Sequence, residues 1–220
     1  MNLSQLTEAI SGVIQDSSFD AVIGTLINEA VLKIAAGDMI PGKYELTPPL
    51  PDLYTVDTVD TELLTGICDL PDDFNRDVVQ ILNSSYEEIP IEPSVRKFLH
   101  KNKEQNAGAV YKCAVQGKRL LYRDIPAVAE TLTVHYYKTP DLLAAGTDEP
   151  TWIPTHLHRK LIVGYVCKEI FDLIEDGIED PKTNTKHYEN IYQKGLMELE
   201  MAIGTDKDAD YYETQTDYCP

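Results

Sequence analysis

Residues 157–174, with the sequence LHRKLIVGYVCKEIFDLI, decide the fold of this chain. Apolar side chains recur there at every third or fourth position, the spacing that gathers them along one face of an α-helix. This face comprises Leu157, Leu161, Ile162, Tyr165, Val166, Ile170, Leu173 and Ile174. Gly177 and Pro181 follow the pattern and predict the end of the helix. A helix with one apolar face needs other elements to cover it.

Three further segments have the same helical spacing. The stripe that follows along the chain contains Tyr188, Ile191, Tyr192, Leu196, Leu199 and Ile203. Near the N-terminus a long stripe contains Val22, Ile23, Leu26, Ile27, Ala30, Val31 and Ile34, and a shorter helix before it carries Leu6, Ile10, Val13 and Ile14. Two helices at each end of the chain cannot bury their apolar faces separately. We therefore predict an antiparallel four-helix bundle, with residues 1–37 as its first half and residues 139–203 as its second.

The middle of the chain, residues 61–138, changes from helical spacing to an alternation of period two. Gln116-Gly117 lies between two alternating runs and predicts the turn of a hairpin, because glycine tolerates the backbone angles that a tight turn requires. Strands are expected at residues 78–82, 109–115, 118–123 and 131–137, with a short helix at 93–102. The sequence therefore predicts an α+β fold in which a small antiparallel β module, residues 61–138, is inserted between the halves of the bundle.

Two segments show neither periodicity. Residues 38–60 include Pro41, Pro48, Pro49 and Pro51, and proline removes backbone donors, so an extended connector is predicted there. Residues 204–220 are polar, acidic and rich in tyrosine, and they are predicted to form an extended acidic C-terminal tail.

Composition and charge limit the classes of function. The chain has 220 residues, 43% of them hydrophobic and 25% charged, which is ordinary for a globular protein. Its 19 Lys and Arg residues stand against 37 Asp and Glu residues, a net charge of −18 that disfavours general binding to nucleic acid or membrane. The longest apolar stretch, residues 161–167, is too short to span a bilayer, and no secretory signal is expected. Four scattered cysteines predict neither a disulfide framework nor a zinc knuckle.

Two groups of residues have the composition of metal ligands but not the geometry. His156 and His158 begin a helix, where positions two apart point to different faces, so we interpret both as solvated helix positions. In the tail, aspartates 206, 208, 210 and 217 occupy positions 1, 3, 5 and 12 of a calcium-binding loop. Tyr211 stands where such a loop requires glycine. No catalytic residue, metal or cofactor is therefore predicted.

Two clusters are candidates for binding a partner. The only basic cluster includes Arg96, Lys97, Lys101 and Lys103, which suits a phosphate or an acidic protein surface, although a solvated helix face has the same composition. The tail offers aromatic rings and carboxylates, because tyrosine is enriched at protein interfaces. Its candidate residues are Asp208, Asp210, Tyr211, Tyr212 and Tyr218.

The order of several short motifs resembles a known family. They are Leu26-Ile27-Asn28-Glu29-Ala30, residues 70–76 (LPDDFNR), residues 115–120 (VQGKRL), residues 134–140 (VHYYKTP), Asp148-Glu149-Pro150 and residues 153–158 (IPTHLH). In this order and spacing the chain is similar to the head-to-tail adaptor, also called head-completion or connector, proteins of tailed bacteriophages. The likeness covers roughly residues 3–203; the proline-bearing connector and the acidic tail depart from the family pattern.

The resemblance implies a structural, non-enzymatic virion protein at the portal vertex, assembled in the host cytoplasm. Such proteins form a ring of about twelve copies that joins the portal protein to the tail nozzle or tail tube protein. Phage DNA passes through the ring without sequence-specific binding, and no membrane is involved. Two alternatives stay open from the sequence: another phage tail-completion ring protein, and a metal-dependent enzyme or calcium-binding module that uses the acidic tail.

Overall fold

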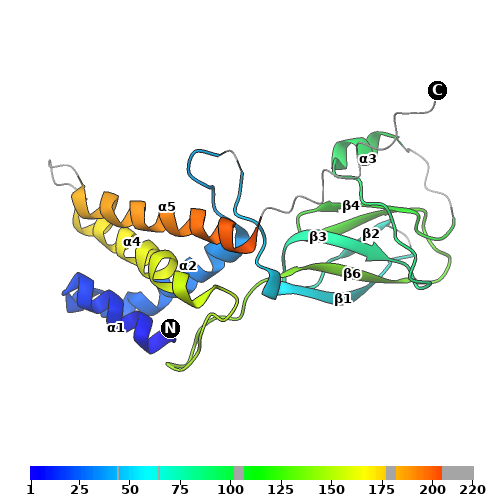
Figure 1. Cartoon of the computed structure of the whole chain (residues 1–220). Helices are drawn as coiled ribbons and strands as arrows, with labels where there is room; N and C mark the ends of the chain where they lie inside the picture. Colours follow the sequence, from blue (N-terminus) through cyan, green and yellow to red (C-terminus); the bar gives the residue numbers. More distant parts are fainter. Residues whose placement is uncertain (44, 64, 102–106, 177–181, 205–220) are drawn as a thin grey trace. The chain divides into compact units, whose positions relative to one another are not determined.

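The chain divides into two compact units in a computed structural model (Figure 1). The helical unit contains Met1–Leu50 and the chain from Pro140 onward, and the β unit contains Pro51–Thr139. The structure describes residues 1–43, 45–63, 65–101, 107–176 and 182–204.

The described residues of the helical unit form four α-helices, each of which overlaps a segment that the apolar spacing predicts to be helical. Asn2 caps the first helix: its Oδ1 accepts from the Gln5 backbone N–H at 2.9 Å, and the Gln5 Oε1 accepts from the Asn2 N–H at 3.1 Å. A π-helical segment, Arg159–Val163, leads directly into the third. The helices are α1 (Leu3–Ile14), α2 (Asp20–Ala36), α4 (Gly164–Ile174) and α5 (Thr183–Ile203).

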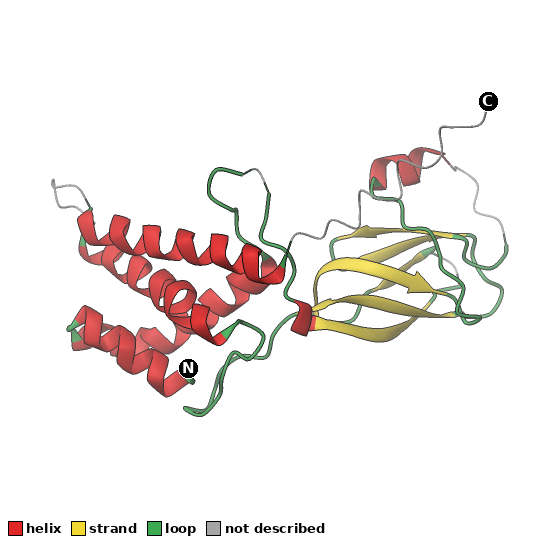
Figure 2. Ribbon diagram, in the orientation of Figure 1, coloured by secondary structure: helices red, strands yellow, loops and turns green. Residues whose placement is uncertain are grey.

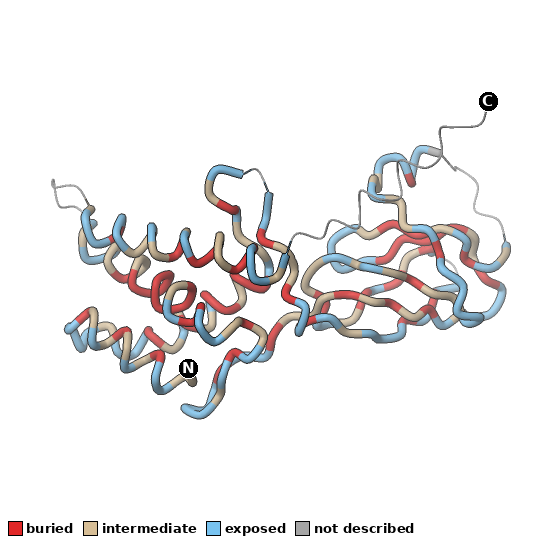
Figure 3. Tube along the Cα trace, viewed as in Figure 1, coloured by how far each residue is buried: buried red, intermediate tan, exposed pale blue. Residues whose placement is uncertain are grey.

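The predicted four-helix bundle is wrong, although the α+β class holds. The described residues form five α-helices and two three-stranded antiparallel sheets. Within the helical unit, α4 with its π-helical segment packs against α1, α2 and α5 and is therefore central. Residues 161–167 are all buried, so this stretch of the π-helical segment and the first turn of α4 is covered around its whole circumference and not along one stripe (Figure 3). A helix that is apolar on every side is a buried helix, and the others surround it.

Helix α5 packs closely against the π-helical segment at Gly195, so replacing this glycine is expected to lower stability. A Cβ atom on Gly195 would lie 3.0 Å from Leu161 Cδ2 and 3.1 Å from Lys160 Cβ. We expect Gly195→Ala to lower the free energy of unfolding by about 1–3 kcal/mol, because the buried Leu161 has to move. Gly24→Ala in α2 is the matched control: its Cβ meets nothing within 4 Å, so a gain of up to about 1 kcal/mol from helix propensity is expected. Urea unfolding measures both, and equal effects would contradict the packing argument.

The β unit contains two antiparallel sheets of three strands each (Figure 2). The first has the order β1-β6-β3, with β1 at Tyr54–Asp60, β6 at Thr131–Lys138 and β3 at Phe74–Leu82. The second has the order β2-β5-β4, with β2 at Ile67–Asp69, β5 at Arg119–Arg123 and β4 at Lys112–Gln116. The predicted hairpin is confirmed: β4 and β5 pair across a turn in which Gly117 has a φ of +60°.

One core joins the two sheets. It contains Val59, Phe74, Ile81, Leu132, Val134 and Tyr136 from the first sheet and Cys68, Cys113, Leu120 and Tyr122 from the second. A short helix, α3 (Val95–Lys101), packs beside β4 (Figure 1). Its buried Phe98 contacts Ala114 and Leu121, side chains that belong to a second, smaller cluster. Helix α3 therefore covers part of the second sheet and leaves its own other side exposed.

The last seven residues of the predicted connector form a strand. Residues 54–60 form β1, which pairs with β6 from Tyr54 opposite Tyr137 to Asp60 opposite Thr131. Proline cannot donate to a strand ladder, and the last proline of the segment, Pro51, precedes β1. The sequence YTVDTVD alternates apolar and polar side chains in part and is rich in β-branched residues. It therefore forms a regular strand when β6 pairs with it.

Candidate interaction surfaces

The structure shows two of the predicted binding residues in full. Arg96 and Lys97 are exposed on α3, and Lys101 ends that helix. Lys103 lies outside the described residues. The same is true of the tail candidates Asp208, Asp210, Tyr211, Tyr212 and Tyr218, and of the whole calcium-loop pattern. Of the two predicted binding surfaces, only the basic cluster lies largely within the described residues.

The exposed side of α3 combines cations with apolar groups. Arg96, Lys97 and His100 are exposed, and Leu99 between them is 51% exposed. A hollow of about 470 Å³ is lined by Val95, Arg96, Leu99 and His100. Within the described part of the chain, no carboxylate lies within ion-pair distance of Arg96 or Lys97. We call these five residues the α3 face.

The two histidines at 156 and 158 do not form a site together. His156 is exposed, whereas His158 is completely buried, so the interpretation of His158 as a solvated helix position is wrong. Its Nε2 donates to the backbone carbonyl of Ile153 at 2.8 Å, and its Nδ1 lies 2.8 Å from the amino group of Met1. That amino group is also 2.6 Å from a carboxylate oxygen of Glu149. His158 is therefore a structural residue that fixes the turn before α4.

Acid is expected to destabilise the helical unit through His158. Burial lowers the pKa of this imidazole below its ordinary value of 6.5, so the unfolded chain takes up a proton at higher pH than the folded chain. The contribution to stability is complete above that ordinary value and is lost as the pH falls below it, toward the folded pKa. Urea unfolding between about pH 5 and pH 8, followed by Trp152 fluorescence, measures this slope.

Two variants serve as controls for this titration. His158→Gln keeps an N–H donor near the Nε2 position but does not titrate, so we expect it to flatten the slope. His156→Gln changes an exposed imidazole and should leave the slope as it is. If the free energy of unfolding of His158→Gln depends on pH as steeply as that of the wild-type protein, other groups cause the pH dependence.

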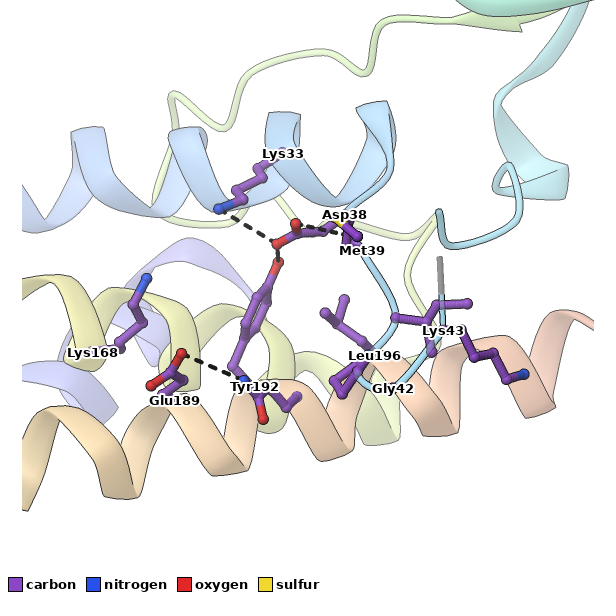
Figure 4. A pocket seen from close by; sticks show the side chains of 12 residues that line it. Lys33, Asp38, Met39, Gly42, Lys43, Lys168, Glu189, Tyr192 and Leu196 are labelled. Atoms are coloured by element: carbon purple, nitrogen blue, oxygen red, sulfur yellow. Dashed lines mark hydrogen bonds and ion pairs between the residues drawn. The ribbon is translucent and has the colours of Figure 1, made fainter. Parts of the chain in front are cut away.

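A second surface feature is a charged pocket of about 360 Å³ in the helical unit (Figure 4). It lies where α2, α4 and α5 meet the loop after α2. The Tyr192 hydroxyl donates to Asp38 Oδ2 at 3.0 Å, and Lys33 Nζ lies 3.4 Å from the same oxygen. Burial, reinforced by the Asp38 carboxylate, raises the pKa of Tyr192, so its hydroxyl keeps its proton at neutral pH.

The lysines of this pocket are already neutralised. Lys33 pairs with Asp38, Lys43 pairs with Glu200, and Lys168 pairs with Glu169. Lys33 and Lys168 also lie 5.1 Å and 5.5 Å from the centre of the Tyr165 ring. Sequence reasoning missed the pocket because its members come from four separate segments, which the hydrogen bond from Tyr192 to Asp38 and the ion pairs of the lysines bring together. Its paired charges tie the loop to the helices.

The chemistry of the described thiols is that of core residues. Cys68, Cys113 and Cys167 are buried. Burial raises the pKa of Cys68 and of Cys167 to about 12 and also raises the pKa of Cys113, so all three stay protonated at neutral pH. Across the described ranges, three or more His, Cys, Asp or Glu side chains nowhere converge as ligands for a metal ion. Among the helices described, none is both long enough and apolar enough to cross a membrane.

The described surface features are the exposed α3 face and the charged pocket, both on an α+β scaffold of two units. In a comparison with known families, a family model described as SU10 adaptor protein matches residues 1–216. The chain therefore belongs to the SU10 adaptor protein family, a family of phage head-to-tail adaptors, which confirms the resemblance seen in the sequence. No curated protein matches the chain. A phage adaptor is a structural component of the virion, and the family is generally non-enzymatic.

Proposed function

We propose that this protein forms a ring of about twelve copies that joins the phage portal protein to the tail nozzle or tail tube protein. The observation that carries the proposal is the match of the adaptor family model to residues 1–216, which covers both units and most of the tail. In this role the ring lies at the neck of the virion, at the portal vertex, after assembly in the host cytoplasm.

The charge of the chain suits a ring through which DNA passes. A basic channel would hold DNA, because lysine and arginine bind phosphates with release of counterions. A chain with a net charge of −18 repels phosphates instead. We propose that the acidic surface forms part of the DNA channel and that the DNA passes without sequence-specific binding.

Two surfaces are proposed as sites for protein partners. The first is the basic cluster with Arg96, Lys97, Lys101 and Lys103, which suits an acidic protein surface. The second is the acidic tail, which offers Asp208, Asp210, Tyr211, Tyr212 and Tyr218 to the portal protein or to a neighbouring copy. An extended segment can wrap a partner over a large area, which supports this role for the tail that the sequence predicts to be extended.

Cryo-electron microscopy of the purified virion, with quantitative mass spectrometry of its proteins, tests the proposal. We expect about twelve copies of the chain per particle, in a ring between portal and tail. A ring at the far end of the tail would assign the chain to tail completion. Absence of the chain from the particle would overturn the adaptor function.

A further inference from the structure

One loop of the β unit holds an exposed tyrosine in place with its own hydrogen bonds. The loop of residues 83–88 follows β3, and Asn83 organises it. The Asn83 Oδ1 accepts from the backbone N–H groups of Ser85 and Glu87, both at 2.9 Å, and its Nδ2 donates to a Glu87 carboxylate oxygen at 3.0 Å. The Tyr86 N–H donates to the Asn83 carbonyl at 2.9 Å. We call residues 83–88 the Tyr86 loop.

Tyr86 itself is not explained by packing within the described fold. Its side chain is 79% exposed, and its φ is +61°, a left-handed conformation that costs a residue with a side chain about 1–2 kcal/mol. Strained backbone conformations cluster at active sites, ligand clamps and switch regions. In this chain Gln15, Asp77 and Asp124 also have a positive φ, so the exposure of the Tyr86 ring carries the argument together with its backbone. The hydrogen bonds fix the backbone that carries Tyr86, so less backbone entropy is lost on binding, and tyrosine is enriched among the residues that anchor interfaces.

The position of the Tyr86 loop in the sheet makes it project from one end of the β unit. Leu82, just before the loop, pairs with Thr133 near the start of β6, whereas Phe74 pairs with Lys138 at the end of β6. The chain enters the unit at Pro51 and leaves it after Thr139, close to that second end. The Tyr86 loop is therefore at the end of the first sheet opposite to these crossings, and exposed Glu87 and Glu88 follow the ring.

The α3 face has the complementary chemistry. Residues 93–103 (PSVRKFLHKNK) contain no acidic residue, in a chain that is otherwise strongly acidic. Leu99 and Val95 provide an apolar centre, with Arg96, Lys97 and His100 around it. The Tyr86 loop has the reverse charge around a similar centre, one aromatic ring beside two carboxylates.

We propose that the Tyr86 loop of one copy docks on the α3 face of the neighbouring copy, with Tyr86 against Leu99 and the two carboxylates against Arg96 and Lys97. This contact rests on the ring of the proposed function and names the side chains that build it. The two surfaces are different parts of the same unit, so each copy would use one surface toward one neighbour and the other surface toward the next. Such a heterologous contact is the type that generates rings. Copies with a net charge of −18 repel each other unless acids meet bases at their interface. A DNA phosphate would suit Arg96 and Lys97 but leaves the apolar centre unused.

A photo-crosslinker tests which molecule the loop contacts. Tyr86→p-benzoylphenylalanine places the reactive group at the tip of the loop in assembled virions, and the matched control is Val128→p-benzoylphenylalanine, at an equally exposed position of the same unit (79% and 78% exposed). After irradiation we expect a product with the mass of two chains, joined between position 86 and residues 93–101, and none from the control. Products with portal, tail protein or DNA, or no product, would overturn the proposal.

Charge exchange gives a second, independent measurement. Glu87→Lys with Glu88→Lys, or Arg96→Glu with Lys97→Glu, should each lower the copy number per virion about tenfold or more, because like charges then meet. All four side chains are exposed, so global folding should be unaffected. Glu87→Lys also removes the hydrogen bond from Asn83 Nδ2, so Glu88→Lys with Lys97→Glu is the matched exchange that leaves this bond in place. The combined variant should recover most of the wild-type copy number; no recovery would overturn the contact. The copy number and position of the wild-type chain in the virion test the proposed ring separately. If the wild-type chain forms the ring but the combined variant does not recover its copy number, only this contact is refuted.

Discussion

Truncation after Gly204 is expected to leave a folded protein that no longer joins its partner. Helix α5, the last described helix, ends at Ile203, so truncation after Gly204 keeps every described helix whole. If the tail supplies even about 2.7 kcal/mol of binding, its loss weakens assembly about a hundredfold. The test compares thermal unfolding with the yield of infectious particles from cells that produce only the truncated chain. Unfolding should be unchanged while the yield falls by about that factor.

Two sets of point variants separate the contributions of the tail. One set replaces Asp208 and Asp210 by asparagine, and the other replaces Tyr211, Tyr212 and Tyr218 by alanine. A loss confined to the second set would assign binding to aromatic burial, and a loss confined to the first would assign it to charge. Normal incorporation of the truncated chain into virions would show that the tail is not a binding segment.

The substitution Leu161→Ala should have the largest effect on stability. Leu161 is completely buried in the π-helical segment beside α5, and removing its side chain leaves a cavity. We expect a loss of about 2–5 kcal/mol in the free energy of unfolding. The matched control is Leu173→Ala, the same change in α4 at a position that is 65% exposed, with an expected loss below about 0.5 kcal/mol.

Denaturant unfolding followed by Trp152 fluorescence measures both variants. Trp152 is the only tryptophan of the chain and belongs to the helical unit, so the signal reports on that unit and not on the β unit. Leu161 and Leu173 both belong to the apolar stripe of the sequence, so a helix buried along that stripe alone would lose similar stability at the two positions. Similar losses would therefore contradict the central place of the segment that contains Leu161.

Part of the proposed binding surface could be predicted from the sequence. The basic cluster is visible because Arg96 and Lys97 are adjacent in the chain, and local charge is a property of neighbours. Tyr86 was not singled out. The turn residues at 83–85 (Asn-Ser-Ser) are a signal for a loop, but the left-handed backbone of Tyr86 depends on hydrogen bonds that only the folded loop shows.

Patterns within the sequence predict most of the local elements, and the order of its motifs identifies the family. The apolar stripes predict α1, α2, α4 and α5, and Gly117 predicts the hairpin of the β unit, because both depend on spacing within a few residues. The order of short motifs identified the adaptor family, which the family model confirms. The net charge of −18 is also fixed by composition alone.

The tertiary structure decided how these elements are used. Whether α4 is covered on one side or on all sides depends on where α1, α2 and α5 cross it, and spacing within one helix does not contain that information. The same holds for β1, which is a strand because β6 lies beside it, and for His158, which is buried because the turn at Ile153 closes over it. Contacts between residues far apart in the chain are set by packing, and packing is a property of the whole fold.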